Sequence, residues 1–138
     1  MDGRTLRIAI NKLKPKAALC IDHNKSVKEA IFLMKKENQT CVCIVEHEKL
    51  VGILTERDVL TKIVGHKRDI IKTKLSEVMT LNPEYLLIDD EVAFALNRMH
   101  VGGFRHIPLV NDEGIPEGIL SVQNIAEYLV KNLETGKI

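Results

Sequence analysis

The spacing of apolar and polar residues changes along the chain, and each change marks an expected element. Residues 17–21 form a short apolar stretch typical of a strand, and a helix is expected from Ser26 to about Asn38. The helix begins with a Ser-x-x-Glu capping box. Apolar positions then recur at helical spacing: Val27, Ala30, Ile31, Leu33 and Met34. Residues 41–45 and 49–54 predict two strands around a polar turn, His47-Glu48.

A second helix is expected from Thr55 to about Val64, with Gly65 closing it. The same series of elements then starts again. Residues 86–88 predict a strand, and Asp89 or Asp90 is expected to cap a helix that runs to about Val101. The remaining expected features are the helix end at Gly102-Gly103, strands at 107–110 and 114–120 around the turn at 111–114, and a last helix from Ser121 that Gly136 follows.

The chain contains an internal repeat. Val51-Gly52-Ile53-Leu54-Thr55-Glu56-Arg57-Asp58 returns 66 residues later as Glu117-Gly118-Ile119-Leu120-Ser121-Val122-Gln123-Asn124. The first copy spans about 8–66, a polar linker 67–74, and the second copy 75–135. A copy of about 60 residues is marginal alone. We therefore expect one α/β domain, built from two pseudo-twofold-related β-α-β-β-α units packed through their sheets.

Composition excludes several partner classes. Twenty basic residues oppose nineteen acidic ones, and Trp is absent, so nothing indicates a nucleic-acid or membrane partner. No apolar run approaches the ~20 residues that span a bilayer. The amino terminus lacks a signal-peptide pattern, so a cytoplasmic location is expected.

The three cysteines favour packing over chemistry. Cys41 and Cys43 point the same way along one expected strand, and with Cys20 they suggest a metal site. However, the ligand spacings of structural zinc sites are missing, and free cysteine behaves as a small buried apolar residue. We expect neither a metal nor a disulfide framework.

The repeat and its motifs resemble the CBS domain, which occurs in tandem pairs called Bateman modules. The resemblance rests on Met79-Thr80-Leu81-Asn82-Pro83, on the Arg-His-x-Pro-x-Val segment at 105–110, and on G-x-x-[ST]-x-x-[DN] closing each copy. Nothing remains outside the pair to form a catalytic domain, so the chain looks like a stand-alone module. The resemblance implies a ligand sensor without chemistry of its own, commonly a homodimer, that regulates an unidentified partner protein.

The resemblance also implies an adenosine-containing ligand, such as AMP, ADP, ATP, S-adenosylmethionine or NAD, in the cleft between the copies. No other cofactor is required. An ionised Asp has two acceptor oxygens for a ribose diol, and Arg offers a donor fork for phosphate. His106 adds a donor, and it faces inward only if the strand at 107–110 begins after it. The implied pocket comprises Ile53, Thr55, Asp58, Tyr85, Leu86, Arg105 and His106.

A second, weaker pocket would use the equivalent positions of the other copy. Asn124 replaces Asp58 and so fits a diol less well, and Thr40 and Cys41 stand where Arg105 and His106 stand. Lys16 or Arg4 could replace the missing cations in part. We therefore expect one competent site per chain, around Asp58, and one degenerate or differently tuned site. The second pocket would comprise Lys16, Ala17, Thr40, Cys41, Ser121 and Asn124.

Alternative interpretations remain open at this point. Thr55-Glu56-Arg57-Asp58 also has the form of a capping box, and spacing alone favours that reading, whereas the resemblance favours ligand contact. A ligand-free dimeric scaffold with vestigial pockets is the second alternative. A small thiol hydrolase using Cys41 or Cys43 with His106 is the third, although cysteines in an apolar strand suit packing better than attack.

Overall fold

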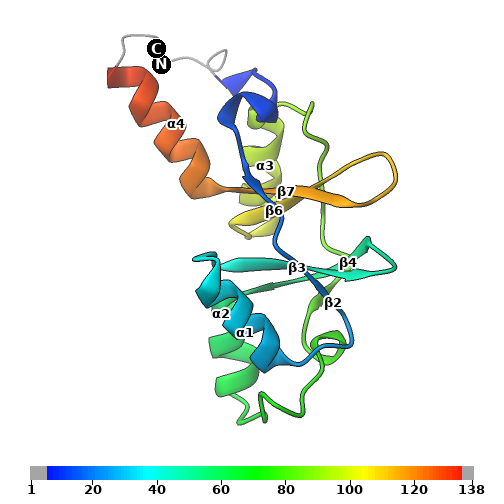
Figure 1. The fold of residues 1–138 in the computed structure, drawn as a ribbon. Coiled ribbons are helices and arrows are strands. Elements are labelled where there is room, and N and C mark those ends of the chain that lie inside the picture. Colours follow the sequence, from blue (N-terminus) through cyan, green and yellow to red (C-terminus); the bar gives the residue numbers. More distant parts are fainter. Residues whose placement is uncertain (1–5, 135–138) are drawn as a thin grey trace. The chain divides into compact units, whose positions relative to one another are not determined.

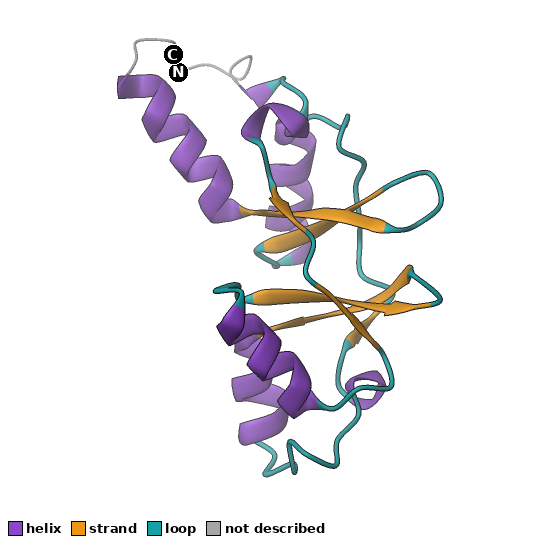
Figure 2. Cartoon of the chain, in the orientation of Figure 1, coloured by secondary structure: helices purple, strands orange, loops and turns teal. Residues whose placement is uncertain are grey.

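The computed structural model describes residues 6–134, which gather into two compact units. The central unit comprises Ala18–Pro83 and Asp112–Pro116. The C-terminal unit comprises the described residues up to Ala17, Glu84–Asn111, and the described residues from Glu117 onward. Both units combine a sheet with helices (Figure 2), and the predicted α/β class is confirmed.

The central unit is built on a four-stranded sheet with the order β2-β3-β4-β5. β2 (Cys20–Asp22) runs parallel to β3 (Cys41–Glu46), which pairs antiparallel with β4 (Lys49–Thr55), and β4 pairs with β5 (Thr80–Leu81). His47 and Glu48 both have positive φ in the β3–β4 turn. Two positive-φ residues in succession give the turn the backbone twist that a tight hairpin favours.

The helices of the central unit lie on one side of its sheet (Figure 1). α1 (Val27–Lys36) begins as predicted, because the Ser26 hydroxyl accepts from Glu29 N–H and Glu29 Oε2 accepts from Ser26 N–H. α2 (Glu56–Asp58) continues as the π-helix η3 (Val59–Val64), and η4 (Leu75–Glu77) follows the linker. Their apolar faces and the sheet bury one core: Val27, Ala30, Met34, Val42, Ile44, Leu54, Ile63, Leu75 and Val78.

The C-terminal unit is built on a three-stranded sheet with the order β1-β7-β6. Its strands are β1 (Lys16–Ala17), β6 (His106–Val110) and β7 (Pro116–Ser121), and β1 pairs antiparallel with β7. Its helices are the 3-10 turn η2 (Ile10–Leu13), α3 (Val92–Gly102) and α4 (Val122–Glu134).

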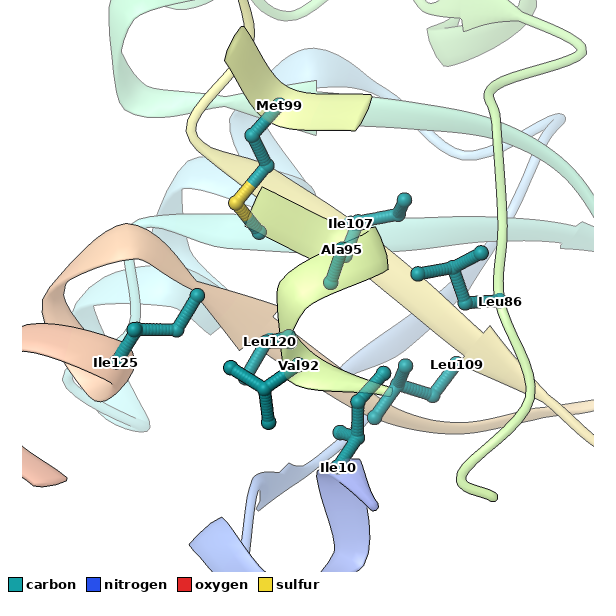
Figure 3. Packing of buried hydrophobic residues seen from close by; sticks show 9 residues of the cluster. All are labelled: Ile10, Leu86, Val92, Ala95, Met99, Ile107, Leu109, Leu120 and Ile125. Carbon is teal, nitrogen blue, oxygen red and sulfur yellow. The ribbon is translucent and has the colours of Figure 1, made fainter. Parts of the chain in front are cut away.

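The core of the C-terminal unit follows from the helical spacing in α3. Val92, Ala95 and Met99 recur on one helix face, and they pack against Ile107 and Leu120 of the sheet (Figure 3). Ile10 of η2 is fully buried in the same cluster. The predicted end of α3 is confirmed, because Gly103 caps the helix with φ 72°. Glycine favours this left-handed conformation.

Four local predictions were wrong. The stretch at 17–21 is not one strand, because Ala17 pairs with β7 while Cys20 and Ile21 pair with β3. Residues 86–88 form only a bridge from Leu86 to Leu109. Neither aspartate caps α3: Glu91 is its N-cap residue, and Asp90 Oδ2 instead accepts from Leu87 N–H. β7 begins at Pro116 rather than at Gly114, which has φ 83° in the turn.

Gly65 follows η3 as predicted, but its φ is −62°, so no left-handed cap forms. A Cβ at this position would lie 2.9 Å from the Thr61 carbonyl oxygen, which explains the glycine by close approach. The predicted linker is tied to α1, since Val27 N–H donates to Thr73 O and Lys28 N–H donates to Ile70 O. Gly136 lies outside the described residues. Within residues 6–134, no helix is long and apolar enough to cross a bilayer.

The cap of α1 should contribute measurably to stability. Ser26→Ala removes the acceptor for Glu29 N–H, so we expect a loss of about 1 kcal/mol in unfolding free energy and a Tm lower by about 3–5 °C. Ser76→Ala, at an exposed serine of η4, is the control and should change the unfolding free energy by less than about 0.5 kcal/mol. Equal losses for both variants in urea unfolding would contradict the cap.

Candidate functional site

The junction between β4 and α2 holds Thr55 and Asp58 in a reciprocal pair of hydrogen bonds. Asp58 N–H donates to Thr55 Oγ1 at 3.1 Å, and Thr55 N–H donates to Asp58 Oδ2 at 3.0 Å. The capping box expected from spacing is therefore present. Because the cap uses Oδ2, the other carboxylate oxygen is left for further interactions.

The second copy repeats this junction between β7 and α4. Asn124 N–H donates to Ser121 Oγ at 3.1 Å, and Ser121 N–H donates to Asn124 Oδ1 at 3.0 Å. One side-chain oxygen suffices for this cap, and an amide supplies it as well as a carboxylate does. The negative charge at position 58 is therefore not required by the local backbone.

The remaining oxygen of Asp58 faces a cation of its own unit. Lys62 Nζ lies 3.6 Å from Asp58 Oδ1, and the Asp58 side chain is 19% exposed. Lys62 Nζ also donates to Val78 O and to Thr80 Oγ1, so the ammonium is shared among three acceptors. An oxygen held at this distance still has lone pairs for a hydroxyl donor. At the equivalent place, Asn124 offers amide donors.

Thr40 and Cys41 lie beside the Thr55–Asp58 junction within the central unit. Glu56 N–H donates to Thr40 O at 2.8 Å, and Cys41 is the register partner of Thr55. Burial, and secondarily the charge of Asp58, raises the pKa of the Cys41 thiol to about 12. Ile53, also expected in the first pocket, is a buried β4 residue that is register partner to Cys43.

The other four residues of the predicted first pocket belong to the C-terminal unit. Leu86 is buried and exchanges backbone hydrogen bonds with β6, donating to Pro108 O and accepting from Val110 N–H. Tyr85, next to it, is 58% exposed. Leu86 pairs with Leu109, which follows His106 by three residues. At about 3.3 Å per strand residue, Tyr85 and Leu86 therefore lie about 10 Å along β6 from Arg105 and His106.

Arg105 and His106 stand at the start of β6. Arg105 is exposed, and its carbonyl accepts from Val122 N–H at 3.0 Å. His106 was expected to face inward only if the strand began after it. The strand begins at His106 itself, yet this residue is half-buried. Burial, and then the positive charge of Arg105, lowers the pKa of His106 below its ordinary value. The imidazole is therefore mainly neutral at pH 7 and retains one N–H donor.

Two residues of the predicted second pocket meet at an open cavity on the surface of the C-terminal unit, whose four lysines are all exposed. Lys16 and Asn124 both line this cavity, which has a volume of about 670 Å³. Ala17 and Ser121 belong to the same unit, in β1 and β7. Sequence reasoning missed most of the lining, although the alternating lysines at 12, 14 and 16 were a visible signal. The full lining is Ile8, Lys12, Leu13, Lys14, Lys16, Asn124, Glu127, Tyr128, Lys131 and Asn132.

Cys41 and Cys43 are poorly placed for nucleophilic chemistry. Cys41 and Cys43 are buried, whereas Cys20 is exposed. A hydrogen bond between the thiols of Cys20 and Cys43 lowers the pKa of Cys20, and the same bond together with burial raises that of Cys43. Over the described part of the chain, no group of three or more His, Cys, Asp or Glu side chains could hold a metal ion.

Thiol labelling should separate these three residues. With iodoacetamide near pH 8 we expect Cys20 to be modified first, because thiolate is the reactive species, and this thiol is exposed and has a lowered pKa. Cys41 and Cys43 should react only after denaturation, as measured by peptide mass mapping. Prompt modification of either one in the native protein would instead support the thiol-hydrolase alternative.

Comparisons with known proteins agree with this organisation. The family described as CBS domain matches residues 15–65 and 75–131. A CBS domain-containing protein of Arabidopsis thaliana, CBSCBSPB1, is 30% identical over 74% of this chain, which spans only 19% of that relative. An uncharacterised 17.7 kDa protein of Acidianus ambivalens is 32% identical over 83% of the chain and 70% of its own length.

A solved structure adds a ligand-bound example. It is a CBS domain pair in complex with 5′-methylthioadenosine and S-adenosyl-L-methionine, 25% identical to this chain. The two structures have a TM-score of 0.78, and the match covers 88% of this chain and 98% of the other.

Proposed function

Because the chain belongs to the CBS-domain family, whose pairs are regulatory ligand-binding modules, we propose that it senses an adenosine-containing ligand. The ligand is AMP, ADP, ATP, S-adenosylmethionine or an NAD form. Its binding draws on residues of both units and changes the conformation presented to a regulated partner protein. Such a ligand shifts the conformational equilibrium only by its difference in affinity for the two states.

One observation carries this proposal: position 58 has a carboxylate, although an amide is enough to cap the helix. Asn124 makes the same two hydrogen bonds with the same geometry. Asp58 therefore keeps a charged acceptor beyond its structural role. A carboxylate can accept from both hydroxyls of a ribose diol, whereas the free end of Asn124 donates.

The other residues supply the remaining contacts of a nucleotide. In the proposed complex, Ile53 from one unit and Tyr85 and Leu86 from the other lie against the base. Arg105 binds phosphate through its donor fork, and neutral His106 donates one further hydrogen bond. The separation of about 10 Å along β6 between the apolar and cationic pairs suits a ligand extended from base to phosphate.

Asp58 and Asn124 form a matched pair for testing this proposal. Asp58→Asn should keep the cap, as Asn124 does, and change Tm by less than about 2 °C. It should nevertheless weaken adenosine-ligand binding by about tenfold or more, because a charged acceptor is lost. Titration calorimetry with AMP, ADP, ATP, S-adenosylmethionine and NADH measures this. Asn124→Ala is the control, and it should leave the affinity for S-adenosylmethionine, which has no phosphate, within about twofold.

Two results would contradict the ligand proposal. One is a panel in which no ligand binds or raises Tm, although a ligand at 100 times its Kd should add about 2.7 kcal/mol of stability. The other is equal binding by wild type and Asp58→Asn. Either result would favour the ligand-free scaffold.

We also propose that the chain forms a homodimer. Large apolar side chains are exposed on helices of each unit, including Phe32 on α1 and Phe94 on α3 at 68% and 49%. A monomer would leave these side chains in water, and an interface between two chains would remove them from it.

Light scattering after gel filtration tests the dimer. At micromolar concentration we expect twice the 15.6 kDa mass of one chain. The double variant Phe32→Asp/Phe94→Asp should shift the mass toward that of a monomer, because each exposed ring is replaced by a charge that the interface cannot bury. A wild-type protein that elutes as a monomer would contradict the proposal.

A further inference from the structure

The cavity of the C-terminal unit concentrates positive charge. Four lysines line it, against one carboxylate, Glu127. They are Lys12 in η2, Lys14 at the end of η2, Lys16 on β1 and Lys131 on α4. Glu127 Oε1 accepts from Gln123 Nε2 at 3.1 Å. Among the side chains that the structure describes, which exclude that of Glu134, no ion pair joins any of these four lysines to a carboxylate. The positive charge of the cavity is therefore not neutralised locally, although the net charge of the whole chain is only +1.

The internal repeat shows that the fold does not require these lysines. An offset of 68 residues aligns Lys12, Lys14 and Lys16 with Thr80, Asn82 and Glu84 of the other copy, and an offset of 66 aligns Lys131 with Gly65. The other copy therefore has no lysine at any of these four positions, although its Lys62 aligns with Tyr128 of the lining. These four lysine positions are therefore specific to the copy that carries Asn124.

Lys14 also holds a backbone conformation that lysine disfavours. It caps η2 with φ 50° and ψ 62°, and its counterpart Asn82 likewise has φ 50°. Both residues precede proline. Asn tolerates the left-handed region better than Lys does, because its short polar side chain can bond locally. A lysine retained at this position is consistent with a use for its ammonium group.

Asn124 fits an anion better than the aspartate of the other copy would. Its Oδ1 is engaged by Ser121 N–H, so the end left to the cavity is the amide nitrogen with its donors. A carboxylate here would repel phosphate. The exchange of Asp58 for Asn124 between the copies therefore suits a change of ligand preference rather than simple decay of the pocket.

We infer that this cavity is a second ligand site, which binds a small molecule carrying two or more phosphate groups. The lysines and the Asn124 amide bind the phosphates, and Ile8, Leu13 and the Tyr128 ring form a wall for an organic part. A volume of about 670 Å³ lies within the range of small-molecule pockets. The inference is independent of the proposed adenosine site, since no residue of the central unit takes part.

Inorganic tripolyphosphate is the probe, titrated by calorimetry at about 50 mM and 150 mM salt. We expect one site per wild-type chain and weaker binding at the higher salt. Lys12→Gln/Lys131→Gln should lower the affinity by about tenfold or more, because two charge-assisted contacts are lost. The control is Lys28→Gln/Lys72→Gln, which removes the same charge from exposed positions of the central unit and should lower the affinity by less than about twofold.

Lys14→Asn keeps the test valid if the double variant folds poorly. It restores the residue type of Asn82, so Tm should be unchanged or higher while tripolyphosphate affinity falls. Absence of wild-type binding, equal losses in the two double variants, or full affinity in Lys14→Asn would each overturn the inference. Titration of wild type and Asp58→Asn with adenosine, which has no phosphate, reports separately on the proposed adenosine site.

Discussion

The strand-to-helix junction is the interaction on which the structure depends. In each copy the last residue of the second hairpin strand is a hydroxyl residue, and its side chain accepts from the backbone of a residue three positions later. That later residue returns the bond with its own side-chain oxygen. The exchange satisfies two backbone donors that a helix start otherwise leaves without partners. It also fixes the side chain of position 58 or 124 at the helix start.

Because both copies use the same junction, their chemical differences can be separated from structural need. An amide at 124 supports the cap fully, so the charge of Asp58 is available for a ligand. The four lysines that line the cavity with Asn124 are not matched by lysines at the aligned positions of the other copy. The fold therefore does not need their charge either. Duplication followed by such divergence would leave one copy suited to a neutral diol and the other to an anion.

Much of the fold was predictable because local signals agreed with the packing. The capping box at Ser26, the apolar face of α1 and the glycine after α3 all appear as the pattern indicated. The stretch at 17–21 was misjudged because strand pairing is decided by distant partners, Gly118 for Ala17 and Cys43 for Cys20. Asp90 was misjudged because its carboxylate bonds back to Leu87 instead of forward to the helix.

One candidate site could be predicted from local sequence, whereas the other depends on tertiary structure. Thr55 and Asp58 could be found from sequence, since the junction is local and its motif recurs. The lysine cavity could not, because it joins the segment around η2 to the third turn of α4, more than 100 residues later. Only tertiary structure brings Lys12 and Lys131 to one surface. Lys16 and Asn124 were predicted as members of a pocket, but without the cations that accompany them.

A crystal structure of the protein grown with AMP tests the central claim most directly. The account predicts both ribose hydroxyls within about 2.6–3.2 Å of the Asp58 carboxylate, with the Thr55 cap intact. AMP bound with its ribose elsewhere, while Asp58 contacts only Thr55 and Lys62, would contradict it.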